Sequence, residues 1–570
     1  MDHYPNVTRF VCLALGLLFT PWSMALGFIT QPEIRQNPNP AVPLAALVYF
    51  KADQGLSAII EINDGERQWE VAFPADSDSA AGLMILGMRA NREHHLKVML
   101  HGASGQHEAA TVLHYTTPPL PDDSLEWPPI QVVKSQPSRM EPGVTIVSVR
   151  RRIPERANLM SKAQLQFNAS YGVIVALDAQ GQVVWYYQAG TRIAGIDRLA
   201  NGNIIFHNHD FRTVEIDMLG NKVREFYAEL RPYPKPANPQ AIPIRKLQTL
   251  HHQPHQTPMG TFLSFSANQR RIENWYASEY DSIPRKAQTI MGDTIVEFDN
   301  RGEVLWSWNA FDYLDIWRIG YETFDPYWIT RGYPDTWDWS HGNGVSYDPE
   351  DDSVIASFKL QDAIIKIDRA SGDIKWIFGD PTGWNEELSK KLLRPIGEVQ
   401  WPYHMHNPRW THKRTLLVFN NNKGQAMPFD GRGIKPFEET LSHVIEYQID
   451  EENRTVRQLW TSETTIGEDS CVSPAMSEAH RLPTTNNILA INAMCAKAGT
   501  KDLTWNPWDL TKRHQAELPR GARIREYTHQ MPPEVVYELR FDDPHDVLQW
   551  EVYGGFRTPS LYPQQKGVAH

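Results

Sequence analysis

The stretch "TIVEFDNRGEVLWSW" (residues 294–308) alternates apolar and polar residues on both sides of a short polar turn. The alternation predicts a β-hairpin, because successive side chains of a strand point to opposite faces of a sheet. The pattern is an apolar strand, a turn that contains Asp or Gly, and a second strand that usually ends on Trp. It occurs six times, and the other five copies are "VIVALDAQGQVVWYY" (173–187), "TVEIDMLGNKVREF" (213–226), "AIIKIDRASGDIKWIF" (363–378), "HVIEYQIDEENRTVRQLW" (443–460) and "VVYELRFDDPHDVLQW" (535–550).

Five of these hairpins follow another strand pair with its own turn: "RLANGNIIFHN", "TPMGTFLSFS", "DPEDDSVIASF", "THKRTLLVFN" and "PTTNNILAIN". Four strands per unit, repeated with loops of varying length, are typical of a β-propeller blade. We therefore predict an all-β fold in which residues 141–570 form a six-bladed β-propeller. The remaining strands of the blade that carries 173–187 can come from "VTIVSVRR" (144–151) or from the C-terminal "FRTPSLY".

Residues 27–140 lack this repeat and contain short alternating runs such as "AALVYFKA" and "HHLKVML". They end in the Pro-rich stretch "TTPPLPDDSLEWPPI" (116–130). This segment predicts a small N-terminal β-sandwich domain followed by a linker. An exposed edge strand in that domain can pair with a second subunit, so we expect a homodimer through the N-terminal domain.

Residues 1–26 read as an export signal. The apolar stretch "FVCLALGLLF" stands between Arg9 and the small-residue stretch "SMA", which is typical of a signal peptide with its cleavage site. An uncleaved membrane anchor is the alternative, although the apolar stretch is short for a membrane span. We expect a periplasmic or secreted protein. Removal of the signal takes Cys12 away and leaves Cys471 and Cys495, an even pair that predicts one disulfide in an oxidising compartment.

The formal net charge of −12 and the isoelectric point near 6.0 argue against a nucleic-acid partner, because phosphate binding depends on Lys and Arg.

Histidines recur at one position of the repeat, the start of the first strand of a blade. In a propeller these strands surround the central channel, so residues at matching positions meet at one end of the axis. The matching stretches are "LHHQPHQTPMG" with His251 and His252, "DWSHGNGVSYDPE" with His341 and Asn343, "WPYHMHNPRW" with His404 and His406, and "SEAHRLPTTNN" with His480. The sequence therefore predicts a ring of imidazoles. By contrast, His207 and His209 in "FHNHD" are interpreted as structural.

A histidine ring can bind a metal, supply a nucleophile and proton-transfer groups, or be structural. Asp and Glu are sparse beside these histidines, whereas Asn343 and Trp339 are present, and Lys359 ends the strand that begins near His341. Amide and imidazole donors together with a cation suit the stabilisation of an anion. We predict neither a metal nor a cofactor.

At these residues the sequence resembles the bacterial arylsulfate sulfotransferases, exported enzymes that use no nucleotide sulfate donor. The resemblance covers most of the chain after about residue 140 and is carried by "HH" ahead of "PMG", by "DWSHGNGVSYDPEDDSVIASFKLQDAIIKID" (338–368) and by "HMHNPRW" with "LLVFNNN" (404–422). It implies a six-bladed propeller that moves a sulfuryl group from a phenolic sulfate ester donor to a phenolic acceptor. The implied mechanism is ping-pong through a sulfohistidine.

The resemblance also implies roles for single residues. His406 becomes the sulfated histidine, with His404 as its close competitor. His252, His341 and Asn343 match the residues that bind the sulfuryl oxygens and assist proton movement. Lys359 stands where the family has an arginine, so a point charge replaces a bidentate fork. The further substrate-binding candidates are His251, His404, Trp339 and Tyr403.

Two other functions remain open from the sequence. One is a non-catalytic exported propeller that binds a glycan or a protein partner, and the other is a metal-dependent or quinone-dependent propeller oxidoreductase. Histidines at matching positions next to a cation favour the sulfotransferase over a binding module, and sensitivity of the activity to a chelator would distinguish the oxidoreductase.

Overall fold

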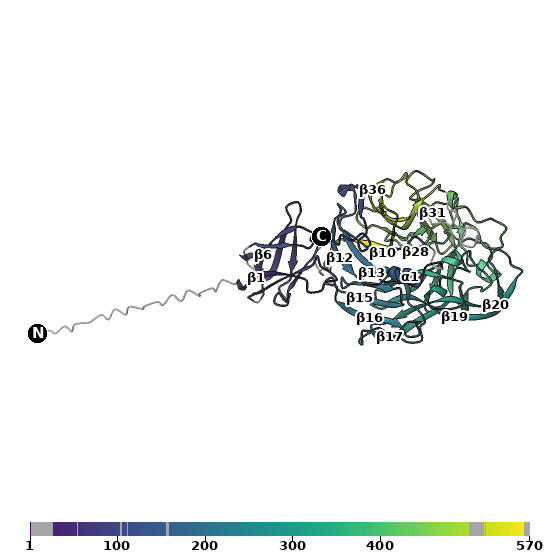
Figure 1. Cartoon of the computed structure of the whole chain (residues 1–570), viewed down its shortest axis with the longest axis horizontal. Coiled ribbons are helices and arrows are strands. Elements are labelled where there is room, and N and C mark those ends of the chain that lie inside the picture. The colour runs from purple at the N-terminus through teal and green to yellow at the C-terminus, as the bar shows by residue number, and fades with distance from the viewer. Residues whose placement is uncertain are drawn as a thin grey trace. The chain divides into compact units, whose positions relative to one another are not determined.

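The structure is a computed structural model that describes residue 1 and residues 27–53, 55–102, 105–110, 112–155, 159–500, 518 and 520–563. The predicted signal peptide, apart from Met1, lies outside these residues. The regular secondary structure of the described chain is almost entirely β-strand (Figure 1). Its short helices are α1 (Lys162–Ala169), α2 (Ala310–Tyr313) and α3 (Glu386–Ser389), with 3-10 turns at Pro137–Arg139, Ile329–Arg331, Lys359–Gln361 and Phe437–Glu439. Within the described residues, no helix combines the length and the apolarity that a membrane crossing requires.

The chain divides into two compact units. The smaller one consists of residues up to 35, 47–83 and 93–115, and the larger one contains 36–46, 84–92 and the chain from 116 onward. The N-terminal strands form two sheets. One is β1 (Phe28–Gln36), β2 (Ala46–Ala52) and β5 (Leu83–Ile85), and the other is β4 (Gln68–Phe73), β3 (Ser57–Asn63), β6 (Glu93–Gly102) and β7 (Gly105–Ala109), with β8 (Leu113–Thr116) paired to β6.

The larger unit contains six sheets, each with four or more strands in a largely antiparallel order. The first three are β37 (Gln549–Thr558), β10 (Val144–Arg152), β11 (Val173–Leu177) and β12 (Val183–Gln188); β13 (Ile193–Arg198), β14 (Ile204–Asn208), β15 (Arg212–Ile216), β16 (Lys222–Ala228) and β17 (Ile242–Ile244); and β18 (His251–Gln256), β19 (Phe262–Tyr276), β20 (Arg285–Phe298), β21 (Val304–Asn309) and β22 (Thr336–Asp338).

The other three sheets follow in chain order. They are β23 (Gly342–Asp348), β24 (Ser353–Phe358), β25 (Ala363–Asp368) and β26 (Ile374–Gly379); β28 (His406–Trp410), β29 (Leu416–Asn420), β30 (His443–Asp450), β31 (Thr455–Thr461) and β27 (Arg394–Pro395); and β33 (Glu478–Arg481), β34 (Ile488–Lys497), β35 (Gly521–Tyr527), β36 (Val535–Phe541) and β9 (Gln131–Ser135), with β32 (Cys471–Val472) paired to β34.

The first strands of the six sheets, β37, β13, β18, β23, β28 and β33, contact one another in sequence. Each contacts the next, and β37 contacts β13 as well as β33. The first sheet joins both ends of the unit, because β37 pairs with β10 from Val144 opposite Thr558 to Arg152 opposite Gln549. Both segments that the sequence offered for this sheet therefore contribute to it.

Five of the six predicted hairpins are confirmed, as the pairs β11–β12, β15–β16, β20–β21, β25–β26 and β30–β31. The sixth, over 535–550, is wrong. Its first half is β36, which pairs with β35 and β9, but Gln549 already begins β37, which pairs with β10 in another sheet. Alternation predicts that both halves are strands, but it does not identify the partner of either.

A recurring turn of Asp, two residues and Gly closes three of the hairpins. Asp178, Asp217 and Asp299 each accept hydrogen bonds from the main-chain N–H groups two and four residues ahead, at 2.8–3.0 Å. The Gly of each turn has φ between 73° and 83°, a conformation that costs glycine least. The Asp and Gly in the repeat therefore explain the tight connections.

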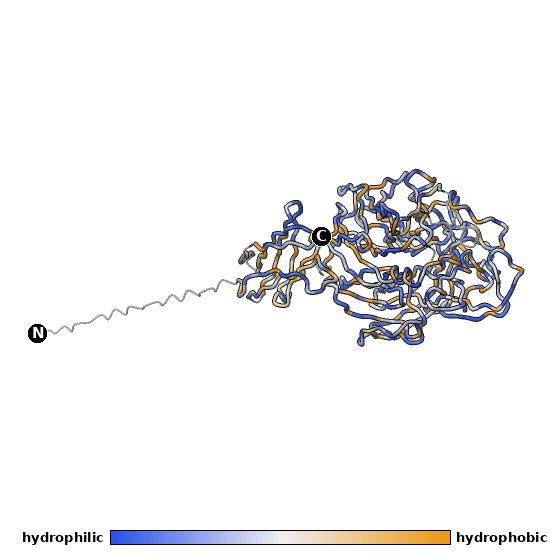
Figure 2. Tube along the Cα trace, in the orientation of Figure 1, coloured by the Kyte–Doolittle hydropathy of each residue, from blue (hydrophilic) through white to orange (hydrophobic). Residues whose placement is uncertain are grey.

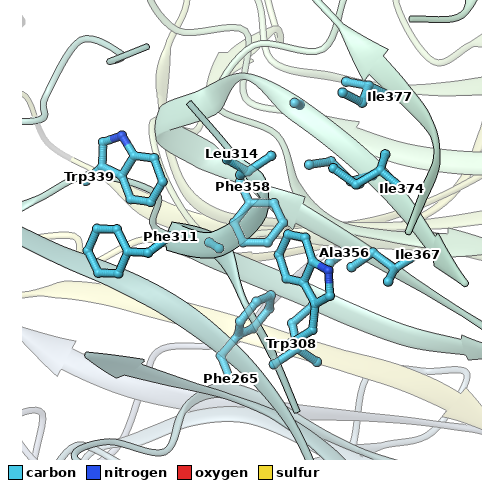
Figure 3. Close-up of a cluster of buried hydrophobic side chains, with 14 of the residues drawn as sticks. Phe265, Trp308, Phe311, Leu314, Trp339, Ala356, Phe358, Ile367, Ile374 and Ile377 are labelled. Atoms are coloured by element: carbon cyan, nitrogen blue, oxygen red, sulfur yellow. The ribbon is translucent and has the colours of Figure 1, made fainter. Parts of the chain in front are cut away.

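Buried apolar side chains form the clusters between neighbouring sheets, and hydrophobic and hydrophilic residues are interspersed along the chain (Figure 2). One large cluster joins the third and fourth sheets through Phe265, Trp308 and Phe358 (Figure 3). Trp308 donates its indole N–H to the carbonyl of Gly372, at 2.9 Å. These contacts fix the first strands of adjacent sheets relative to one another, and the candidate site lies on those strands.

Candidate active site

Irregular backbone marks the starts of three first strands. The register of β18, β23 and β28 shifts within their opening residues. His252, His341 and His404 lie in or just ahead of these strands with φ of 67°, 49° and 51°. A bulge changes the direction of a side chain, and a left-handed non-glycine residue persists only when its surroundings stabilise it. The irregular backbone at these strand starts therefore interrupts the regular pairing and redirects the histidine side chains.

His252 lies at the centre of a cluster of rings. Its ring centroid is 4.9 Å from that of His251, 5.1 Å from His341 and 5.7 Å from His406. Tyr553 of β37 completes the cluster at 5.5 Å from His406. The four histidines are 4–9% exposed, so the cluster is nearly buried but retains some accessible surface. Four of the sequence-predicted residues are therefore brought together.

His406 is held as a neutral imidazole. Burial lowers its pKa to about 3, although Glu478 favours the protonated form. Nε2 lies 3.4 Å from the hydroxyl of Tyr553, Nδ1 is buried, and the main chain of Ser477 beside the ring slightly favours the protonated form. A neutral imidazole has a lone pair on one ring nitrogen, which is the chemical form that a nucleophile requires.

The surroundings of His404 favour the opposite, protonated form. Burial alone would lower its pKa, but Asp362 and Glu322 raise it. Nδ1 is 3.2 Å from Asp362, whose carboxylate also accepts the His404 main-chain N–H, and Nε2 is 3.6 Å from Glu322. A protonated imidazole has no free lone pair. His404 and His406 therefore differ in the availability of a lone pair, which is the property that a nucleophile needs.

A carboxylate and two histidines form a second chain. Nδ1 of His251 and Nδ1 of His252 are 2.6 Å apart, so one of the two donates to the other. Nε2 of His251 lies 3.2 Å from Asp293. Burial, together with the neighbouring histidines, lowers the pKa of His252 well below its usual range. His252 is therefore neutral, and its hydrogen bond with His251 determines which of its ring nitrogens carries the proton.

His341 forms a dyad with Asp338. Its Nδ1 is bonded to one carboxylate oxygen of Asp338, and the other oxygen accepts the indole N–H of Trp328 at 2.9 Å. Burial lowers the pKa of His341, and Asp338 offsets this only in part. With the Nδ1 proton held by a carboxylate, Nε2 carries the lone pair, as expected for a proton acceptor.

Lys359 does not stand alone. Its Nζ donates to Glu322 at 2.5 Å, and Glu322 is also bonded to Lys423. Although burial opposes it, these two cations hold the pKa of Glu322 well below its usual range. The predicted anion-stabilising cation is therefore one member of a network that includes Lys423, His404 and Glu322.

Asn343 links two strands. Its Oδ1 accepts the hydroxyl proton of Ser357 at 2.6 Å, and its Nδ2 donates to the carbonyl of Met405 at 2.7 Å. Met405 lies between His404 and His406, so Asn343 fixes the main chain that carries both.

Two predicted aromatic residues occupy other environments. Trp339 has no exposed surface and stacks on Phe311 with centroids 4.8 Å apart (Figure 3). It donates its indole N–H to the main-chain carbonyl of Arg318. Tyr403 donates its hydroxyl to Asp380 at 2.5 Å and lines a cavity of about 340 Å³. Trp339 thus packs in the core, and Tyr403 belongs to the wall of that cavity.

Sequence reasoning missed several residues that complete the site, namely Tyr553, Tyr327, Glu322, Asp338 and Asp293. The ring of Tyr327 is 4.6 Å from His341. Asp338 had a local signal, since it lies three residues before His341 in "DWSH". The others come from distant segments that no sequence spacing relates to the histidines.

Cys471 and Cys495 are both buried and are present as thiols. A hydrogen bond with Cys495 lowers the pKa of Cys471, while burial raises that of Cys495, so the sulfurs face each other.

The disulfide stays a prediction. We expect protein prepared from an oxidising compartment to show no thiol under denaturing conditions and two after reduction. Detection of two thiols before reduction would contradict the pairing.

Buried neutral histidines predict acid sensitivity. Burial lowers the pKa of His207 and His406 to about 3 and that of His209 and His443 to about 4. Below pH 6.5 these histidines bind protons in the unfolded chain but not in the folded chain. The free energy of unfolding therefore decreases as the pH is lowered, by up to about 1.4 kcal/mol per pH unit for each histidine. We expect the urea midpoint of the larger unit to fall between pH 7 and pH 5, and to fall less steeply in His207→Gln. A constant midpoint would contradict this.

Known proteins match the chain in sequence. Arylsulfate sulfotransferase AssT of Lelliottia amnigena is 28% identical over 209 residues, which are 30% of this chain and 34% of that protein. Arylsulfate sulfotransferase AssT of Escherichia coli O6:H1 (strain CFT073) is 26% identical over 254 residues, which are 37% of this chain and 39% of that protein. The alignments thus span less than half the length of these relatives.

Solved structures give a weaker likeness. A protein of unknown function from Bacteroides caccae has a TM-score of 0.34 at 10% identity and covers 72% of this chain and 99% of its own. The β-propeller domain of Cps50 (Swd1) from Myceliophteria thermophila has a TM-score of 0.30 at 9% identity and covers 73% of this chain and 100% of its own. The assignment of a family therefore rests on sequence.

The model of the arylsulfotransferase (ASST) family matches residues 129–543, which is more than half of the chain. The matched range includes five of the six first strands and the four clustered histidines. The chain belongs to the arylsulfotransferase (ASST) family.

Proposed function

We propose that this protein transfers a sulfuryl group from an aryl sulfate ester to a phenol, without a nucleotide donor, by a ping-pong mechanism through a sulfohistidine at His406. The observation that carries the proposal is the neutral, buried His406 in the histidine cluster of a chain in this family. Its lone pair is available, whereas His404 is protonated between two carboxylates.

In the first half-reaction a ring nitrogen of His406 attacks sulfur, and the bond from sulfur to the aryl oxygen breaks. His341 is neutral in the free protein, but in the donor complex the negative charge of the sulfate ester favours its protonated form, and the leaving phenolate takes that proton. Asp338 keeps the imidazole of His341 in the orientation for this transfer.

In the second half-reaction His341 accepts the proton of the acceptor phenol. The phenolate oxygen then attacks sulfur, and the bond between sulfur and His406 breaks. The products are a new aryl sulfate, a neutral His406 and a protonated His341, so the proton returns to its starting place after each full cycle. Covalent catalysis of this kind divides one difficult displacement into two easier ones.

The transferring group carries negative charge, which His252 and the cation network stabilise in this proposal. The network holds Lys359, Lys423 and His404 against Glu322 and Asp362, and in this proposal its two lysines supply positive charge beside the transferring group. A lysine that already donates to Glu322 binds a sulfate oxygen more weakly than a free arginine fork would. Asn343 contributes by positioning the main chain at Met405.

We also propose the architecture that places these groups. The cyclic contacts among the first strands support a closed six-bladed propeller over residues 141–570, and the two N-terminal sheets support a β-sandwich within 27–140. Export to the periplasm or the medium, and dimerisation through the N-terminal domain, complete the proposal.

The test is an assay of purified protein with 4-nitrophenyl sulfate, with and without phenol. We expect nitrophenolate release that depends on phenol, with parallel double-reciprocal lines when both substrates are varied. Release that proceeds equally without an acceptor would indicate a sulfatase. No release from folded protein, offered several aryl sulfates, would contradict the proposal.

A further inference from the structure

We propose that Glu93, His95 and His114 of the N-terminal unit form a binding site for a divalent transition metal of the Zn²⁺ type. These residues form the one group of three or more metal-ligating side chains, among the described residues, whose donor atoms all lie within 4.8 Å of one another. The family roles described above use none of them.

The strands explain why the three side chains meet. Glu93 and His95 are two residues apart on β6, so both point to its exposed face, while His94 between them is buried. β8 pairs with β6, and the main-chain N–H of Thr117 donates to the carbonyl of Arg92 at 3.0 Å. Antiparallel counting from this bond places His114 opposite His95, which agrees with ring centroids 4.6 Å apart.

The donor atoms are spaced as a metal requires. Nδ1 of His114 is 3.2 Å from one oxygen of Glu93, and Nε2 of His95 is 3.7 Å from the other. Ligands of a tetrahedral Zn²⁺ at about 2.0–2.1 Å from the metal lie about 3.3 Å from each other. Small rotations of exposed side chains therefore suffice to bring all three donors onto one ion.

The donor set selects the class of metal. Two imidazoles and one carboxylate suit Zn²⁺ and neighbouring transition metals rather than Mg²⁺ or Ca²⁺, which prefer oxygen ligands. The three side chains are 52–60% exposed. A fourth position therefore stays open to water or to a donor from a ligand. Exposed ion pairs contribute little to stability. The contribution of Glu93, His95 and His114 to folding therefore does not explain why these three side chains lie together.

Calorimetric titration of untagged, EDTA-treated, full-length protein with ZnCl₂ tests the site. We expect a binding event that weakens at least roughly tenfold in His95→Ala/His114→Ala, since even outer partners of metal ligands change affinity by that much. His412→Ala, which removes another exposed histidine, should leave it unchanged. Because the replaced residues are exposed, circular dichroism should confirm that the double variant folds.

Zinc binding that persists in the double variant but disappears in His406→Ala would overturn the proposal and assign the metal to the central histidine cluster. Absence of any binding to the unsubstituted protein would overturn it as well. We expect the double variant to show the same phenol-dependent turnover as the unsubstituted protein, because the metal site takes no part in sulfuryl transfer. If the unsubstituted protein shows no such turnover, the proposed function fails, but the metal site is still tested by the titration.

Discussion

We expect phenol-dependent release of nitrophenolate to disappear when His406 is replaced by alanine. In the proposed mechanism this residue carries the sulfuryl group between the two half-reactions, so its loss removes the covalent route and not a single stabilising contact. Removal of a nucleophile of this kind lowers kcat by at least roughly 10⁴-fold. The measurement is the initial rate with saturating 4-nitrophenyl sulfate and phenol, in variant and unsubstituted protein.

His404→Ala is the matched control, because it removes an imidazole two residues away that is already protonated. We expect it to weaken donor binding through the Glu322 network while turnover persists. Acid-quenched protein, incubated with donor alone, should carry one added sulfuryl group that fragmentation locates on His406. Activity in His406→Ala together with complete loss in His404→Ala would reverse the assignment.

Asp338→Asn is expected to lower kcat by roughly 10²- to 10⁴-fold, the range seen when a carboxylate that orients a catalytic histidine becomes an amide. The amide carbonyl can keep the hydrogen bond from Trp328, which directs the NH₂ group at Nδ1 of His341. Nδ1 must then accept, and the proton moves to Nε2, where the mechanism needs a lone pair.

The leaving group separates this role from a structural one. A good leaving group such as nitrophenolate departs with little help from an acid, whereas phenolate depends on protonation by His341. Asp338→Asn should therefore slow the transfer from phenyl sulfate more than that from 4-nitrophenyl sulfate. The comparison is made on the first half-reaction, in a single turnover without acceptor, where an equal loss with both donors would show that Asp338 does not act through protonation of the leaving group.

The repeat predicted most of the fold because it rests on local chemistry. Alternating side chains and Asp–x–x–Gly turns, such as the one at Asp299 and Gly302, determine a hairpin within a few residues. The hairpin over 535–550 failed because the connection from Phe541 to Gln549 passes to another sheet, and alternation carries no information about which edge a strand joins. Long-range pairing of β10 with β37 has no local signature.

The site was predictable where its residues share a position in the repeat. His252, His341 and His406 follow from strand starts, but the property that distinguishes His406 from His404 does not. That difference depends on Asp362 and Glu322, which lie 42 residues or more from His404 in sequence and act only after folding. Trp339 was assigned by residue type alone, and its neighbour Phe311 shows why an aromatic side chain beside a site can belong to the core.

The pairing of β10 with β37 also determines when the first sheet and the histidine site can be completed during synthesis of the chain. A ribosome makes β10 before the other strands of the six sheets except β9 and makes β37 after all of them, so the first sheet lacks its partner strand throughout most of synthesis. Tyr553, which faces His406, arrives on that last strand. A chain interrupted before it would carry every clustered histidine and still lack the wall that encloses them. A complete histidine site in such an architecture therefore requires that translation has passed β37.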